Sequence, residues 1–255
     1  MTDADPWGEL VLPPEEPKTI ELGTLRLGIR RAAQELWVQP RRAPEVVDLD
    51  GGPWQRWAVG NASGIHVRPA MPDRMLIVST EHSYHLAPGA ESRFYVRIPL
   101  FVQVVVSTEK GDVVVADVPS MVLSDTWWGA FWEGELAYWL KTTARIEVND
   151  DLFVPHMGMC PVRLMNESPE ALPLDHFAVR AAHLTLFSEG ERSYWTDEVR
   201  VRYEGAPEGS AIRFQGKAPS EAPDARLIAP PRMPSQRGFR ARTFDRLRSF
   251  SNLEF

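Results

Sequence analysis

Acidic and aromatic side chains gather between residues 123 and 145, and their types suit sugar chemistry or ligand binding. The candidate binding residues are Asp125, Trp127, Trp128, Trp132, Glu133 and Glu135. In a strand over residues 133–138, Glu133 and Glu135 project to the same side, because strand side chains alternate between the two faces. Carboxylates beside aromatic planes are typical of a carbohydrate-binding cleft or of a paired acid site of the glycosidase type.

The same residues also have a structural interpretation. The tryptophans then fill the core of a β-sandwich, Asp125 caps a turn, and both glutamates face water. The two interpretations differ in one measurable property. A sugar site needs tryptophan faces that are exposed beside an open pocket, whereas the structural interpretation buries them.

The C-terminal segment is a second candidate for contact with a partner. Residues 226–255 hold seven arginines against Asp245 and Glu254, a balance of +5 in a chain of net charge -7. The candidate tail residues are Arg237, Phe239, Arg240, Arg242, Phe244, Arg246, Leu247, Arg248 and Phe250. Exposed phenylalanines need a surface to dock on. That surface is the protein's own acidic body, a groove of a protein partner, or an anionic membrane.

Residue types that bind metals or act as nucleophiles occur without the spacing that their chemistry needs. Glu81, His82 and His85, and separately His156 with Cys160, match no zinc signature such as HExxH. The motifs GxSxG, GxxxxGK[ST] and GxGxxG are missing. We therefore predict no catalytic residue, no metal and no cofactor, and the negative net charge argues against nucleic-acid binding.

Period-two alternation of apolar residues runs through most of the chain and predicts an all-β fold. We expect one or two antiparallel β-sandwich units of immunoglobulin-like type, with a strong hairpin over residues 101–108 and 113–118 and a further strand at 142–148. The expected organisation is a flexible N-terminus (1–18), a first sandwich unit (19–118), a second unit with the Trp-rich segment (119–215), and a proline-rich linker with a basic amphipathic tail (216–255). The prolines between 216 and 235 argue against regular ladders there, and Thr243 is expected to cap a short C-terminal helix.

The segment LSDTWWGAFWEGELAYWLKTTAR, residues 123–145, resembles the signature of an uncharacterised archaeal and bacterial family, domain of unknown function four hundred and thirty-two. A looser resemblance extends over roughly Ile20 to Glu204, with blocks such as IELGTLRLGIRR and SYWTDEVRVRYEG. Ala137 stands where the family often has cysteine, so a thiol-dependent role does not carry over. The resemblance implies shared ancestry and order, and it implies no activity.

These observations favour a non-enzymatic binding or adaptor protein that contacts a protein partner through the Trp-rich segment and the tail. A peripheral membrane contact through the tail and a homo-oligomer remain open. The alternative is a carbohydrate-binding or carbohydrate-hydrolysing protein using Asp125, Glu133 and Glu135. A single cysteine and an acidic N-terminus without a signal-peptide pattern predict a cytoplasmic protein.

Overall fold

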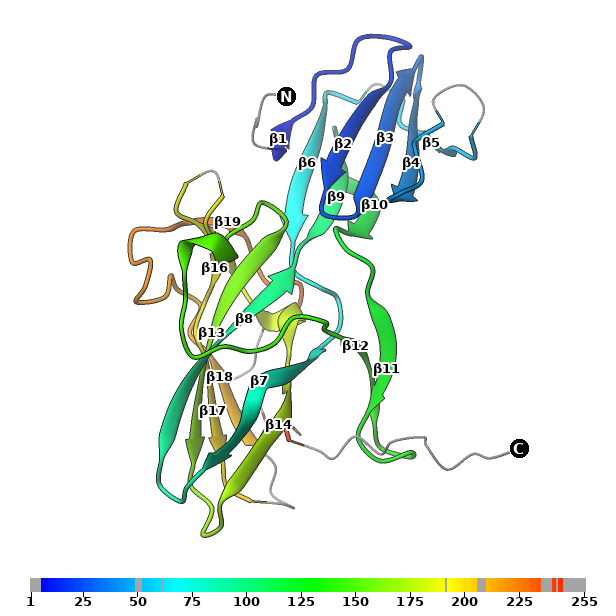
Figure 1. The fold of residues 1–255 in the computed structure, drawn as a ribbon. Coiled ribbons are helices and arrows are strands. Elements are labelled where there is room, and N and C mark those ends of the chain that lie inside the picture. The colour runs from blue at the N-terminus through cyan, green and yellow to red at the C-terminus, as the bar shows by residue number, and fades with distance from the viewer. Residues whose placement is uncertain are drawn as a thin grey trace, which may run out of the picture.

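The computed structural model describes residues 6–48, 52–60, 62–190, 192–205, 210–234, 240–241 and 243–244. Over these ranges the protein is nearly all β-structure, and its helical elements are two short 3-10 turns at Asp150–Leu152 and Ala181–His183 (Figure 1). Most strand pairs are antiparallel, which confirms the predicted all-β class. Among the residues described, no helix combines the length and apolarity that a membrane crossing requires.

Two four-stranded sheets share a hydrophobic core at one end of the molecule. One sheet contains β2 (Lys18–Leu22), β3 (Leu25–Ala32), β4 (Glu35–Arg42) and β5 (Gln55–Ala58). The other contains β1 (Gly8–Glu9), β6 (Gly64–Ala70), β9 (Phe101–Thr108) and β10 (Gly111–Pro119). Alternate residues of each sheet, such as Leu27 and Val104, are fully buried between them. The predicted hairpin of β9 and β10 is confirmed.

A second pair of sheets encloses the largest core. The smaller sheet has the order β11 (Ser124–Trp128), β12 (Glu135–Trp139), β7 (Leu76–Leu86) and β14 (Leu172–Val179). The larger sheet has eight strands, in the order β19 (Arg226–Ala229), β15 (Leu186–Ser188), β16 (Tyr194–Thr196), β13 (Met157–Asn166), β17 (Val199–Tyr203), β18 (Ser210–Phe214) and β20 (Arg240–Ala241), with β8 (Glu91–Pro99) also paired to β13. Buried side chains from both sheets, Phe94 and Phe177 among them, meet in one cluster.

The two pairs of sheets are joined by continuous segments of chain (Figure 1). Leu100 alone separates β8 from β9, and its carbonyl accepts the backbone N–H of Ser120. The Ser120 carbonyl in turn accepts the N–H groups of Thr24 and Leu25. Gly23 lies at this junction with a φ of +58°, and a Cβ there would approach the Ser120 oxygen to 2.7 Å. The connection therefore requires glycine at this position.

Strand pairing differs from the expected layout in three places. The sheets are not divided at the expected boundary after residue 118, because β7 and β8 pair with β14 and β13 from the later part of the chain. The expected strand at 142–148 is wrong, since Ala144 and Arg145 make only isolated bridges. The expected absence of ladders in the proline-rich segment is also wrong. Strand β19 pairs with β15 there, because its four residues lie between the prolines and keep their N–H donors.

Both ends of the described chain contact the sheets. Strand β1 lies within the segment expected to be flexible and pairs with β6. At the other end β20 pairs with β18. Thr243 and Phe244 are not helical, and the rest of the expected C-terminal helix lies outside the described residues.

Candidate functional site

The Trp-rich segment forms a β-hairpin, β11 and β12, at the edge of the smaller sheet of the second pair. Trp127 lies opposite Leu136, and Trp128 lies opposite Glu135. In the connection, the Ala130 carbonyl accepts the N–H groups of Glu133 and Gly134 at 3.1 and 2.7 Å. Glu133 is therefore in the turn, and the prediction that it shares a strand side with Glu135 is wrong because β12 begins only at Glu135.

The turn closes tightly around a second glycine. The Trp127 indole N–H donates to the same Ala130 carbonyl at 3.2 Å. A Cβ on Gly134 would lie 2.2 Å from that indole nitrogen and 2.7 Å from the Trp128 carbonyl oxygen. A side chain at this position would displace the indole, so glycine fixes how the connection folds.

One face of the hairpin is anchored in the molecule. Trp128 is 2% exposed and Ala137 is fully buried, and both pack on Met75, Ile77 and Ala178 in a small hydrophobic cluster. These contacts hold the hairpin on strands β7 and β14. For Trp128 the structural interpretation is therefore correct.

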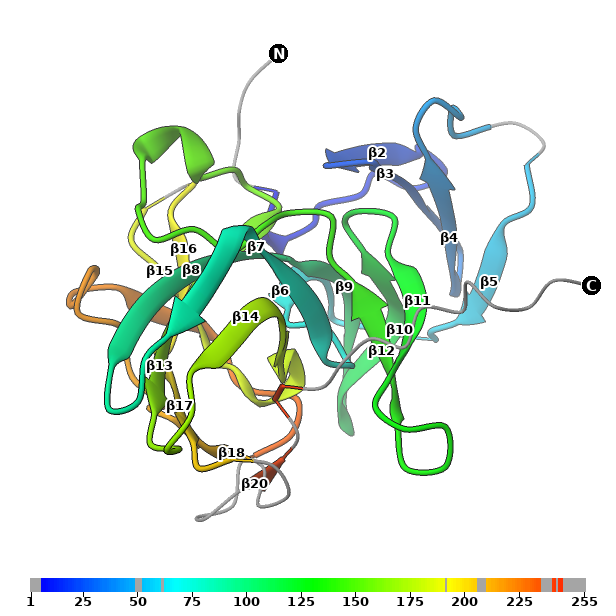
Figure 2. The same cartoon turned by 60° about the horizontal axis from the view of Figure 1, so that its bottom comes forward.

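The other face and the tip expose large apolar side chains. Trp132 is 88% exposed and Phe131 is 67% exposed, and their rings form an edge-to-face pair with centroids 4.8 Å apart. Trp127 and its cross-strand neighbour Leu136 are 40% and 45% exposed. Figure 2 shows the loop between β11 and β12 projecting beyond the strands of its sheet. We call Trp127, Phe131, Trp132 and Leu136 the aromatic tip.

Two carboxylates of the hairpin, Asp125 and Glu135, accept hydrogen bonds from arginines. Asp125 accepts a hydrogen bond from Arg74 at 2.8 Å, and Glu135 accepts two from Arg180 at 2.9 and 2.7 Å. The hydrogen bond from Arg180 lowers the pKa of Glu135 from its usual value, so this carboxylate stays ionised. A glycosidase acid needs the opposite shift, because it must hold a proton at neutral pH.

The histidines and the cysteine singled out in the sequence do not form a metal centre in the described part of the chain. Over those ranges no group of three or more His, Cys, Asp or Glu side chains is arranged to hold an ion. Burial raises the pKa of the Cys160 thiol and lowers the pKa of His156. The thiol is buried against the sheet, in surroundings opposite to those that activate a nucleophile.

The described residues of the tail contact the protein's own body. Arg240 forms an ion pair with Glu204 at 2.6 Å. The Phe244 ring packs edge-to-face on Tyr203 with centroids 5.3 Å apart, and the Thr243 carbonyl accepts the N–H of Ala178. The remaining tail candidates lie outside the described residues: Arg237, Phe239, Arg242, Arg246, Leu247, Arg248 and Phe250.

Sequence reasoning missed several residues of the hairpin. Phe131 and Leu136 complete the aromatic tip. Arg74 and Arg180 bind the hairpin carboxylates Asp125 and Glu135. Phe131 had a local signal, since it stands beside Trp132 in a connection rich in glycine. The arginines had none, because Arg74 and Arg180 are distant in sequence from the carboxylates that they bind.

The fold and this hairpin define a nearly all-β protein with paired sheets and an anchored edge hairpin. A family model described as "Protein of unknown function (DUF432)" matches residues 6–248. The chain therefore belongs to this family, which confirms the resemblance seen in its Trp-rich segment. No match was found among curated proteins or among solved structures.

Proposed function

We propose that this chain is a non-enzymatic binding protein that contacts a protein partner through the aromatic tip of the β11–β12 hairpin. The observation that carries the proposal is the contrast within five residues of chain between Trp128, which is 2% exposed, and Trp132, which is 88% exposed. A hairpin that anchors one tryptophan in a core presents the other to solvent. Exposed aromatic clusters of this kind are typical of contact surfaces.

Burial of the aromatic tip against a partner would contribute a large favourable free energy of binding. Fully burying an aromatic side chain removes roughly 150–250 Å² from water, so Phe131 and Trp132 together are worth several kcal/mol at about 25 cal/mol per Å². Tryptophan is also among the residues that dominate measured interface energies. A partner with an apolar groove fits this surface.

The supports of the hairpin reduce the entropy that binding would otherwise remove. Trp128 and Ala137 hold its inner face, while the Arg74–Asp125 and Arg180–Glu135 ion pairs hold both strands. A contact surface that is already ordered loses less conformational freedom on association. This feature favours recognition by the hairpin over recognition by a flexible peptide.

The carbohydrate alternative has less support. Glu135 and Asp125 are bound to arginines, and Glu133 lies in the turn, so the three do not form a paired acid site. The described part of the tail contacts Tyr203 and Glu204 of the same chain, which supports self-docking for these residues. The proposal therefore places the partner at the hairpin.

Photo-cross-linking tests the proposal directly. A photoreactive amino acid replaces Trp132 in the full chain expressed in its natural host, and the same replacement at Trp57 serves as control. Trp57 lies on β5 and is 40% exposed, so it is an exposed aromatic outside the hairpin. We expect a discrete protein adduct from position 132 that position 57 does not give.

Three outcomes would overturn the proposal. Identical adducts from both positions would show non-specific capture. Adducts to lipid alone would make the tip a membrane contact. Adducts to a second copy of the chain alone would make it a homo-oligomer interface.

A further inference from the structure

An arginine-rich face lies on the outer side of the eight-stranded sheet. Along β17, Val199 and Val201 point into the core while Arg200 and Arg202 point outward, as the strand period requires. The same alternation turns Arg93, Arg163 and Arg213 outward on β8, β13 and β18. The register of the sheet determines which of these arginines are direct neighbours on adjacent strands.

Register places four arginines in one row across four strands. Arg93 pairs with Arg163, Arg163 with Arg200, and Arg200 with Arg213. Neighbouring strands lie about 4.8 Å apart, and like charges directly opposite each other destabilise a sheet. The row therefore needs negative charge nearby.

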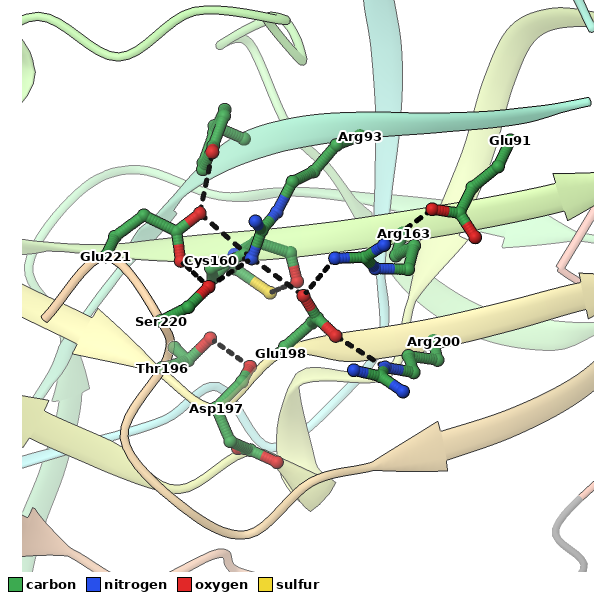
Figure 3. A network of polar contacts seen from close by, with 12 residues as sticks. Glu91, Arg93, Cys160, Arg163, Thr196, Asp197, Glu198, Arg200, Ser220 and Glu221 are labelled. Atoms are coloured by element: carbon green, nitrogen blue, oxygen red, sulfur yellow. Dashed lines mark hydrogen bonds and ion pairs between the residues drawn. The ribbon is translucent and has the colours of Figure 1, made fainter. Parts of the chain in front are cut away.

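Glu198 supplies that charge to three of the four arginines. Its carboxylate accepts hydrogen bonds from Arg93 at 2.7 Å, Arg163 at 3.5 Å and Arg200 at 2.5 Å, and its side chain is only 8% exposed (Figure 3). Burial by itself would raise the pKa of Glu198, but the Arg200 hydrogen bond and the charges of Arg163, Arg200 and Arg93 lower it. Glu91 and Glu221 add further partners for Arg163 and Arg93.

The outer end of the row is left without a carboxylate. Arg213 is exposed and makes no hydrogen bond or ion pair with any other described residue. Arg200 uses only its Nε atom for Glu198, so its two terminal nitrogens point away from that bond. The Arg213 guanidinium and the terminal nitrogens of Arg200 are therefore hydrogen-bond donors available to a bound anion.

A hollow lies beside these two arginines, with a small residue at its floor. Ala211 pairs with Arg202 on one side and with Arg240 on the other, and Arg213 follows two residues along the same strand face. The resulting pocket has a volume of about 530 Å³ and is lined by five arginines and three glutamates, a balance of +2. That size is within the range of small-molecule sites.

We infer that this pocket binds a small molecule carrying at least two phosphoryl groups, held by Arg200 and Arg213 with Arg202 and Arg240 around it. A guanidinium group can donate two parallel hydrogen bonds to the oxygens of one phosphoryl group, in a bidentate contact. It also stays positively charged at any physiological pH. The pocket volume of about 530 Å³ is much larger than a single phosphoryl group, which favours a ligand that carries several. This inference is independent of the proposed function.

Isothermal titration calorimetry of the full chain with tripolyphosphate tests the inference. We expect binding that sulfate at matched ionic strength does not reproduce. Arg213→Gln should weaken the affinity about tenfold or more, because a charge-assisted hydrogen bond is lost. Arg226→Gln, which removes an exposed arginine on β19 outside the pocket, should change the affinity less than about twofold.

A second variant changes shape without changing charge. Ala211→Met fills the floor of the hollow and should also weaken binding, while leaving every arginine in place. Equal affinities for sulfate and tripolyphosphate would overturn the inference, as would equal effects of Arg213→Gln and Arg226→Gln. Binding of a polyglutamate peptide but not of tripolyphosphate would also overturn it.

Discussion

The aromatic tip and the arginine row expose opposite kinds of chemistry, yet each rests on one buried group. Trp128 anchors the hairpin whose tip exposes Phe131 and Trp132. Glu198 holds the arginines whose outer end exposes Arg213. In both regions the exposed group makes few contacts with the fold and the buried group makes many. This contrast separates residues that stabilise the protein from residues available to a ligand.

Removing the buried tryptophan should have the largest effect on stability. Trp128→Ala leaves a cavity in the cluster with Met75 and Ile77, so we expect the free energy of unfolding to fall by about 3–5 kcal/mol. Trp132→Ala should change it by less than about 0.5 kcal/mol, because its side chain is mostly in water already. Urea unfolding of both variants measures the difference. Equal losses would show that the tip supports the fold.

Neutralising the buried carboxylate should have the next largest effect. Glu198→Gln removes the charge that three arginines share, and breaking a buried ion pair costs about 3 kcal/mol. Glu204→Gln is the matched control, since it breaks only the more exposed pair with Arg240 and should cost at most about 1 kcal/mol. Thermal unfolding of the two variants tests this order. A Glu198→Gln variant as stable as Glu204→Gln would contradict the account.

Low pH should remove the contribution of Glu198 to the stability of the folded protein. Its pKa in the folded protein is below the unfolded value of about 4.3, so its stabilisation is complete above that pH and disappears as the pH falls through the folded pKa. Buried Asp197 has a raised pKa and the opposite sign, but it is present in both proteins being compared. The stability gap between wild type and Glu198→Gln should therefore shrink below about pH 4. A stability difference that stays constant down to pH 2 would show that the charge of Glu198 does not stabilise the arginine row.

The ion pair on the hairpin should matter least. Glu135 is 54% exposed although its partner Arg180 is 12% exposed, so Glu135→Gln should cost no more than about 1 kcal/mol and less at high salt. Denaturant unfolding in low and high salt measures both effects. A loss as large as that of Trp128→Ala would mean that charge, rather than packing, anchors the hairpin.

The sequence predicted local features better than distant ones. The alternation that predicted β9 and β10 and the concentration of tryptophans both lie within short stretches of chain. The arginine row could not be predicted from the sequence, because its members come from four strands and only the sheet register aligns them. These members are Arg93, Arg163, Arg200 and Arg213. Strand β14 was also missed, since its pairing with β7 shifts between Leu174 and His176 and interrupts the regular alternation.

The central claim is that the aromatic tip serves binding and not stability, and one paired measurement tests it. Partner recovery and free energy of unfolding are compared for the double variant Phe131→Ser with Trp132→Ser and for the control Trp57→Ser. We predict that the double variant loses at least about 90% of the partner, in line with the energy of aromatic contact residues, while its stability changes by less than about 1 kcal/mol. Partner recovery equal to that of Trp57→Ser would contradict the claim.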